Sequence, residues 1–253
     1  MKLTFLGTGT SQGIPVIACQ CPVCLSSDSR DKRLRTAALI EADGINIAID
    51  AGPDFRQQML TAGVKSLDAI LVTHEHRDHI AGIDDVRAFN WVLKRPMDIW
   101  AEERVQDALR AEFAYIFAEM KYPGVPEVNL HSIDGYPFDV HGHKIIPIRA
   151  YHHKLPVYGF RIGDLTYITD ANFISEEEKE KIYGTKYLVI NALRMQKHLS
   201  HFSLPEVLRL VAELSPKRAY ITHVSHQMGL YKDIAVGLPD NVCFAYDGLT
   251  IDF

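Results

Sequence analysis

The sequence lacks several features that mark whole classes of protein. No run of apolar residues approaches the roughly 18–20 that a helix needs to cross a bilayer. The apolar stretch at residues 3–6 is too short for a signal peptide, and there is no internal repeat or low-complexity tract. The net charge is −5, so the basic balance of a non-specific nucleic-acid binder is also missing. We therefore expect a cytoplasmic protein without a membrane partner, and nucleic acid is disfavoured as a partner.

Cysteine is scarce, with four residues in a chain of 253. Three of them, Cys19, Cys21 and Cys24, nevertheless lie within six residues of one another. A disulfide framework is typical of short secreted chains, and this chain is neither short nor expected to be secreted. Three thiolates in one loop suit a tetrahedral zinc ion that still needs a fourth ligand. Three unrelated buried thiols are the alternative.

Length and composition favour a single domain over residues 1–253. Residues 8–36 form a long loop rich in Gly, Pro, Ser and Cys, and a bound zinc ion would explain a loop of that length. The Asp43-Gly44 pair predicts a tight turn between strands at residues 37–42 and 45–50.

Apolar runs and helix-start signals place the other elements. Helices are expected at residues 102–118 and after two capping boxes that begin at Ser175 and Ser203. The remaining expected strands are residues 2–7, 69–73, 144–150, 157–162, 165–169, 218–222, 242–244 and 249–251. Blocks of hairpins with interspersed helices predict two packed sheets with helices outside, rather than alternating βαβ units.

A dense group of candidate metal ligands follows the strand predicted at residues 69–73. His74, His76, Asp78 and His79 fall within six residues. Alternate residues of an extended segment point the same way, so His74 and His76 can hold one cation. Asp78 and His79 can face a second cation after the chain turns. Imidazole and carboxylate ligands suit Zn, Mn or Fe. A solvated polar loop is the alternative, and so many imidazoles argue against it.

Further candidate ligands follow later strands. They are the adjacent pair His152 and His153, then Asp170, then His223. Each lies where a predicted strand meets a loop, which is a common position for catalytic groups on a rigid scaffold. Asp170 could bridge two cations.

The motif at residues 74–79, with a later histidine, aspartate and histidine, resembles the metallo-β-lactamase superfamily. The segments 7–15, 19–24 and 222–227 narrow the resemblance to the cyclic-phosphate phosphodiesterases of phosphonate degradation. The resemblance covers essentially the whole chain. It implies an αββα sandwich, in which two mixed β-sheets are flanked by helices and the metals lie at one edge of the sheets.

The resemblance also implies a set of ligands for two divalent metals, Zn or Mn, with Fe as a further option. Asp170 would bridge the two. The first metal would also take His74, His76 and His152, and the second would take Asp78, His79 and His223. His152 is preferred to His153 because its segment aligns best with the first histidine as the ligand.

Three further roles complete the expected site. By resemblance, His226 would be the fourth ligand of a structural zinc held by the three clustered cysteines. The same resemblance makes His201 a proton donor, and an ordinary surface histidine is the alternative. Asp50 fits a role in orienting the metal loop through hydrogen bonds, and a turn aspartate at a strand end is the alternative.

Two metals with few carboxylate ligands leave positive charge, which favours an anionic substrate. The resemblance implies a phosphodiesterase for a small cyclic phosphate or nucleotide-like diester. Asp170 and the metals would orient the nucleophile, and His201 would protonate the leaving group. The alternatives are a tRNA 3′-end endonuclease, a thioester, lactone or β-lactam hydrolase, and a non-enzymatic metal-binding module. No long basic arm for tRNA is visible.

Residues 87–126 are longer and more aromatic than the resemblance leads us to expect. Most of these aromatic side chains would be core. The others would wall the pocket or form a contact in a homodimer, so the segment leaves the physiological substrate and the oligomeric state open.

Overall fold

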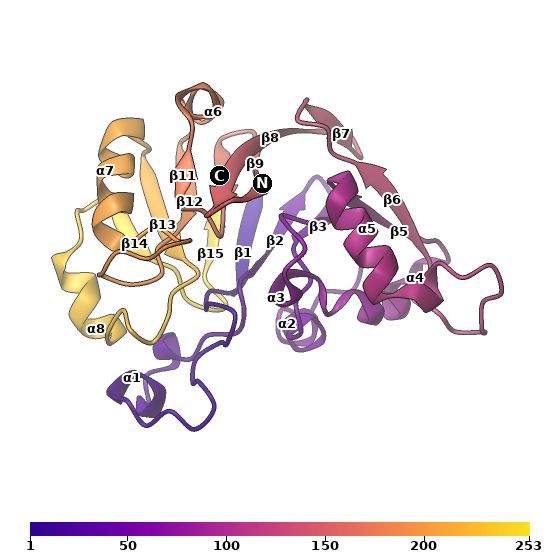
Figure 1. The fold of residues 1–253 in the computed structure, drawn as a ribbon, viewed down its shortest axis with the longest axis horizontal. Helices are drawn as coiled ribbons and strands as arrows, with labels where there is room; N and C mark the ends of the chain where they lie inside the picture. Colours follow the sequence, from indigo (N-terminus) through magenta and orange to yellow (C-terminus); the bar gives the residue numbers. More distant parts are fainter.

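Two β-sheets lie face to face in the computed structural model, which describes residues 1–253 (Figure 1). The first sheet has seven strands in the order β15 (Thr250–Asp252), β1 (Lys2–Gly7), β2 (Ala37–Ala42), β3 (Ile45–Ile49), β4 (Ala69–Leu71), β5 (Met97–Ala101) and β6 (Val128–Ser132). The second has eight, in the order β11 (Phe173–Ile174), β8 (His143–His152), β9 (Leu155–Ile162), β10 (Leu165–Ile168), β12 (Tyr187–Asn191), β13 (Arg218–Thr222) and β14 (Val242–Phe244), with β7 (Phe138–Val140) paired to β8.

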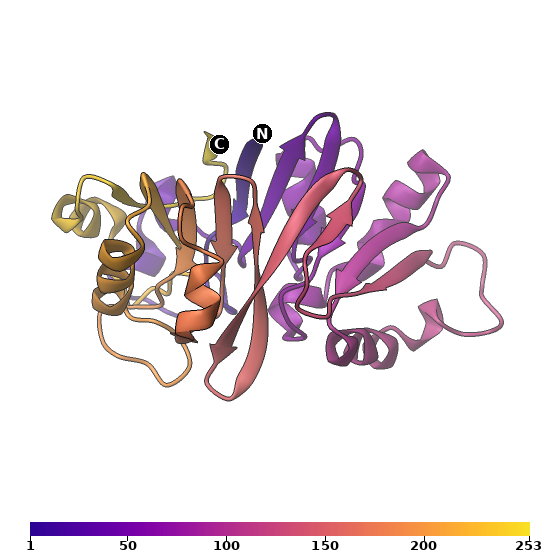
Figure 2. The ribbon, with the colours of Figure 1, turned by 90° about the horizontal axis from the view of Figure 1, so that it is seen from above.

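Both sheets are mixed. Strands β3 to β6 are parallel in the first sheet, and β10, β12, β13 and β14 are parallel in the second. The other pairs are antiparallel, among them the long β8–β9 hairpin that crosses the second sheet in Figure 2.

Helices cover the outer face of each sheet (Figure 1). The first sheet is covered by α2 (Phe55–Thr61), α3 (Arg77–Ile80), α4 (Arg87–Leu93) and α5 (Glu103–Glu112). The second is covered by α7 (Leu204–Leu214), and the short α6 (Glu176–Glu180), which buries no residue, lies at the end of that sheet. Helices α1 (Pro22–Leu25) and α8 (Tyr231–Ile234) lie beyond the sheets. Short 3-10 helices span Ser29–Asp31, Ile83–Val86, Ala114–Ile116 and Ala235–Gly237. No helix has both the length and the apolar character needed to cross a membrane.

Three hydrophobic clusters of 21 buried residues each correspond to these layers. The middle cluster joins the facing sides of the two sheets, with Phe5 and Phe160 among its members. The outer clusters join each sheet to its helices, through residues such as Phe55 on α2 and Val207 on α7. The layers therefore form the predicted αββα sandwich.

Several elements appear where the sequence predicts them. In the β2–β3 hairpin, Asp43 and Gly44 have φ values of 48° and 85°, as a type I′ turn requires. Ser175 caps α6 by accepting from the Glu178 N–H, and at the start of α7 the Glu206 carboxylate accepts from the Ser203 N–H at 2.9 Å.

The helix expected at residues 102–118 is too long. It ends at Glu112, because Phe113 leaves the helical conformation and turns into the outer cluster. The aromatic segment around it is divided between core and surface. Phe89 and Phe113 are buried, whereas Trp91 is 67% exposed and Tyr122 is 82% exposed.

Candidate metal centre

The candidate active-site ligands lie at or just beyond the ends of four strands. The segment 74–79 follows β4, and α3 begins within it at Arg77. His152 is the last residue of β8, Asp170 lies two residues beyond β10, and His223 follows β13 directly. Strands of both sheets thus deliver these side chains to one place, which we call the histidine–aspartate centre.

Within this centre the side chains form two groups that share Asp170. Ligand atoms of Asp78, His79, Asp170 and His223 all lie within 4.8 Å of one another, and so do those of His74, His76 and Asp170. Asp170 Oδ1 lies 3.0 Å from His223 Nε2 and 3.5 Å from His79 Nε2. Its Oδ2 lies 3.9 Å from His74 Nε2. One carboxylate oxygen therefore faces each group.

His152 belongs to the centre and His153 does not. The His152 ring centroid lies 5.1 Å from that of His76, and His152 Nδ1 donates to the Ser200 carbonyl at 2.7 Å. That hydrogen bond leaves Nε2 as the free, unprotonated nitrogen. His153 is exposed in the turn after β8, with its backbone N–H bound to Asn172.

The centre has the properties of a cation site. The buried Nε2 atoms of His74, His79 and His223 have no hydrogen-bond partner, although buried polar groups are normally paired. Burial disfavours the charged ring of His223, yet Asp170 and Asp78 raise its pKa to about 9. The surrounding carboxylates thus favour positive charge at this place. The imidazole and carboxylate donors are those that Zn, Mn and Fe prefer.

Asp50 orients His79 from behind the centre. Its carboxylate is fully buried, and His79 Nδ1 donates to Oδ2 at 2.6 Å. The backbone N–H of Thr73 donates to Oδ1 at 2.8 Å. These bonds direct Nε2 of His79 toward the other candidate ligands. The geometry therefore supports the orienting role for Asp50 rather than the turn aspartate.

Two residues of the centre, and Asp50 behind it, have strained backbones. Asp50, Asp170 and His223 have φ values of 64°, 55° and 54°, in the left-handed region that side chains other than glycine seldom occupy. Each follows a strand, and the turn places the side chains of Asp170 and His223 in the centre and that of Asp50 against His79. Strain of this kind is held by the surrounding fold and gathers at functional sites.

His201 lies beside the candidate ligands without a hydrogen-bond partner for its buried Nδ1. Its ring centroid is 4.4 Å from that of His152 and 4.8 Å from that of His223. Burial and the charge of His223 lower the pKa of His201 to about 3. Its ligand atom also lies within 4.8 Å of those of His152 and Asp170, so this position allows either proton donation or cation binding.

The three clustered cysteines meet His226 across some 200 residues of sequence. The Sγ atoms of Cys19, Cys21 and Cys24 lie 3.3, 3.4 and 3.6 Å from His226 Nδ1. Tetrahedral zinc with ordinary bond lengths would separate its sulfur and nitrogen ligands by about 3.5 Å. The Cys24 N–H donates to the Cys21 thiol and lowers its pKa to about 6, whereas burial raises the pKa of the Cys24 thiol to about 11. The distances match the geometry of a metal site, and the lowered pKa favours a thiolate at Cys21. This cysteine–histidine cluster therefore fits zinc.

Backbone pairing joins the N-terminal loop to the chain after His223. The Thr10 N–H donates to the Val224 carbonyl at 3.1 Å, and the Val224 N–H donates to the Thr8 carbonyl at 2.9 Å. His226 follows two residues after Val224. The cysteine–histidine cluster consequently lies next to the histidine–aspartate centre along the chain.

A charged network near the centre has no signal in the sequence. Glu75, inside the histidine motif, pairs with Arg104. Arg104 also donates to the Pro156 carbonyl at 2.7 Å and to Glu102 at 3.2 Å, and Glu102 binds Arg149 at 2.7 Å. The network joins the loop after β4 to the β8–β9 hairpin, and it can be found only from the tertiary structure.

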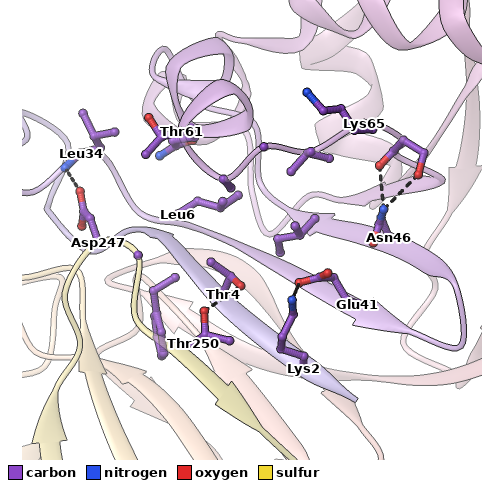
Figure 3. A pocket seen from close by; sticks show the side chains of 18 residues that line it. Lys2, Thr4, Leu6, Leu34, Glu41, Asn46, Thr61, Lys65, Asp247 and Thr250 are labelled. Carbon is purple, nitrogen blue, oxygen red and sulfur yellow. Dashed lines mark hydrogen bonds and ion pairs between the residues drawn. The ribbon is translucent and has the colours of Figure 1, made fainter.

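A cavity of about 550 Å³ lies elsewhere, between α2 and the outer face of β1 and β2 (Figure 3). Its lining contains no histidine or cysteine. Its polar groups largely pair with one another, as Lys2 does with Glu41 and Thr4 with Thr250. This cavity has no group of side chains suited to metal binding or hydrolysis.

The family model for the beta-lactamase superfamily domain matches residues 45–224. The chain belongs to the metallo-β-lactamase superfamily. A solved diphosphatase of the PhnP family has a TM-score of 0.94 and 36% identity, over 100% of this chain and 97% of that one. The chain is therefore a hydrolase of this superfamily that resembles the PhnP family, as the sequence predicts. The fold implies divalent metal ions.

Two other relatives are informative in different ways. Zn²⁺-bound PqqB from Methylobacterium extorquens has a TM-score of 0.81 but 18% identity, over 100% of both chains, and is therefore similar in fold. An octanoyltransferase of Porphyromonas gingivalis is 40% identical over 252 residues, which are 98% of this chain and 51% of that protein. The chain spans about half the length of the curated relatives it matches.

Proposed function

We propose that this hydrolase is a phosphodiesterase that uses two divalent metals and acts on a small anionic ester, such as a cyclic phosphate or nucleotide-like diester. The observation that carries the proposal is the position of Asp170. One of its oxygens faces His79 and His223, and the other faces His74. A carboxylate placed in this way suits a bridging ligand in a two-metal hydrolytic site.

The charge of the loaded centre favours an anionic substrate. Among the side chains that would contact the cations, only Asp78 and Asp170 are acidic, and the other proposed ligands are imidazoles. Against two divalent cations, two carboxylates leave an excess of positive charge. When bound, such cations lower the pKa of a water molecule toward about 7 and offset the charge that develops on phosphorus.

The chain supplies the remaining chemistry. Asp170 would be shared by the two groups of ligands. Asp50 would hold His79 in the tautomer whose unprotonated Nε2 faces the other ligands. Burial and the neighbouring His223 lower the pKa of His201. An adjacent phosphoryl anion raises the pKa of an imidazole, because it favours the charged ring. His201 would then donate its proton to the departing oxygen, a step typically worth about 10²–10⁴-fold.

The similar proteins support this proposal unequally. The PhnP-family diphosphatase favours phosphate chemistry, and it resembles this chain over almost its whole length. The octanoyltransferase is a protein of which this chain matches about half, so its name does not assign acyl transfer to this region. A tRNA endonuclease is disfavoured by the net charge of −5 and the lack of a long basic arm.

We also propose that Cys19, Cys21, Cys24 and His226 hold a structural zinc. The S···N distances of 3.3–3.6 Å support this assignment. The four residues come from two segments, and the apolar cluster that accompanies them has only three buried residues. A metal would therefore supply much of the local stability.

Turnover of a substrate panel by metal-defined enzyme tests the function. The panel holds bis(p-nitrophenyl) phosphate, a cyclic nucleotide or cyclic sugar phosphate, an acyl thioester and a precursor tRNA. The Asp170→Ala variant, purified in parallel, measures contaminating activity. We expect metal-dependent cleavage of the small phosphodiesters. Thioester hydrolysis without phosphodiester cleavage would contradict the proposal, and so would cleavage of precursor tRNA alone.

A further inference from the structure

The position of His201 depends on its backbone rather than on a hydrogen-bonded partner. Its buried Nδ1 is unpaired, and its ring is surrounded by other imidazoles, those of His152, His198 and His223. A catalytic imidazole is commonly oriented by a carboxylate or carbonyl, as His79 is here by Asp50. For His201, the segment 193–203 between β12 and α7 must provide the orientation.

Five hydrogen bonds hold this segment on the side that faces the histidine–aspartate centre and at its base, among them one from the Phe202 N–H to the Ala171 carbonyl at 2.8 Å. The Leu193 N–H donates to the Phe202 carbonyl, and the Leu204 N–H donates to the Arg194 carbonyl, both at 3.0 Å. His152 binds the Ser200 carbonyl at 2.7 Å, and the Asn172 amide binds the Leu199 carbonyl at 3.0 Å. The opposite side of the segment is held by a different set of residues.

Arg194 makes the principal contact on that opposite side. Its Nη1 donates to the Gln227 side-chain oxygen at 2.8 Å, and its Nη2 donates to the Lys197 carbonyl at 3.2 Å. Nε lies 3.4 Å from the Gln196 carbonyl. No carboxylate forms an ion pair with Arg194. Its guanidinium joins the segment to Gln227, and all of its hydrogen-bond acceptors are uncharged.

Gln227 directly follows His226 of the cysteine–histidine cluster. The residue before His226 also reaches the segment. The backbone N–H and the hydroxyl of Ser225 both donate to the Leu193 carbonyl, at 3.0 and 2.9 Å. The residues on both sides of His226 therefore hold the segment that carries His201.

We propose that Arg194 and Gln227 are positioning residues, whose contact transmits the fixed geometry of the cysteine–histidine cluster to His201. The inference rests on the proposed function, since it assigns His201 to leaving-group protonation. It adds a second role to the cluster. Zinc there would stabilise the fold and would also set the position of the proton donor.

Kinetics of Gln227→Leu, Arg194→Gln and the double variant test the contact. Each is assayed on an alkyl phosphodiester, whose leaving group needs a proton, and on bis(p-nitrophenyl) phosphate, whose leaving group needs little help. We expect kcat on the alkyl ester to fall roughly tenfold more than on the aryl ester, with KM little changed. The double variant should lose no more kcat on the alkyl ester than either single variant, because each single substitution already breaks the same contact.

Two variants serve as controls. Gln227→Glu keeps an acceptor for Arg194, so the ratio of kcat on the alkyl ester to kcat on the aryl ester should equal that of the wild type. Arg161 also binds backbone carbonyls, those of Lys181 and Tyr183 at 2.8 Å, but on another part of the second sheet. Arg161→Gln should therefore leave the ratio unchanged. A raised KM for both substrates in Arg194→Gln, with unchanged kcat, would make Arg194 a substrate-binding residue and would overturn the proposal.

Hydrogen exchange supplies a readout that does not depend on the reaction. Gln227→Leu, Arg194→Gln and zinc-depleted protein should exchange the amides of residues 198–203 at least tenfold faster than wild type, while Arg161→Gln should not. Unchanged exchange in the first two variants would overturn the positioning role. If the wild type cleaved no phosphodiester at all, the proposed function would fail, and the exchange rates alone would still decide whether the contact holds the segment.

Discussion

The two candidate metal sites each take a ligand from the segment 223–226, but they are built in opposite ways. The histidine–aspartate centre lies at the ends of four strands between the two sheets, where His74 and His79 are fully buried. The cysteine–histidine cluster lies in loops whose regular structure near the cysteines is the four-residue helix α1. In the first, the hydrophobic layers hold the ligands in place. In the second, we expect a bound metal to help hold the chain in place. Loss of a ligand should therefore mainly lower turnover in the first site and mainly lower stability in the second.

Asp170→Ala should have the largest effect on turnover and a small effect on folding. The variant loses the carboxylate that faces both half-sites, so cleavage of phosphodiesters should fall to the background rate. The surrounding strands and core stay intact, and the midpoint of thermal unfolding should stay within a few degrees of wild type. Steady-state kinetics and calorimetry measure the two effects. An unfolding midpoint far below that of the wild type would contradict the proposed difference between the two sites.

His201→Ala should separate proton donation from metal binding. The variant should keep its active-site metals, because the other candidate ligands remain. It should lose about 10²-fold more rate on an alkyl or sugar phosphodiester than on bis(p-nitrophenyl) phosphate. Equal losses on both substrates would favour a role in holding substrate charge. Loss of a metal ion from the variant would make His201 a ligand instead.

Asp50→Asn should weaken metal binding without removing a ligand. The amide is a poorer acceptor for His79 Nδ1 than the carboxylate, so the affinity of the centre for its metal should fall about 10–100-fold. Metal titration with a competing chelator measures the change. Asp54→Asn is the matched control, because Asp54 binds the Arg35 backbone and side chain nearby rather than a histidine. An affinity equal to wild type would leave Asp50 as a turn residue.

Cys21→Ser should have the smallest effect on chemistry and a clear effect on stability. Loss of one thiolate should lower bound zinc and lower the unfolding midpoint by at least ~5 °C. Turnover of bis(p-nitrophenyl) phosphate by the remaining folded protein should change little. Cys243→Ser controls for the loss of a thiol outside the cluster, since Cys243 lies in β14. Unchanged zinc content and stability in Cys21→Ser would remove the structural zinc from this account.

The local part of the centre could be predicted from the sequence because its spacing follows from strand geometry. His74 and His76 are two residues apart beyond a buried strand, and they lie on one side of the centre as predicted. The partner of Asp50 could not be found in this way, because His79 reaches it across 29 residues of sequence. The left-handed conformations of Asp170 and His223 also have no sequence signal, since side chains there usually avoid positive φ.

The fold shows the same division between local and distant determinants. The β2–β3 hairpin and the capped starts of α6 and α7 are set by neighbouring residues, and the sequence predicts them. The helix expected at residues 102–118 ends early because packing of Phe113 and Ile116 against the first sheet overrides helical periodicity. Strand β6 is an edge strand with only partly buried side chains, so its sequence carries too weak an apolar pattern to predict it.

The most direct test of the central claim titrates metal-free protein with Zn or Mn while phosphodiester turnover and bound metal are measured together. The account predicts three ions per chain at saturation, two at the histidine–aspartate centre and one at the cysteine–histidine cluster, with full activity only when the centre holds both. Cys21→Ser should then need two ions per chain for full activity on the aryl ester. Full activity with one ion at the centre, or a saturated centre that cleaves no phosphodiester, would contradict the account.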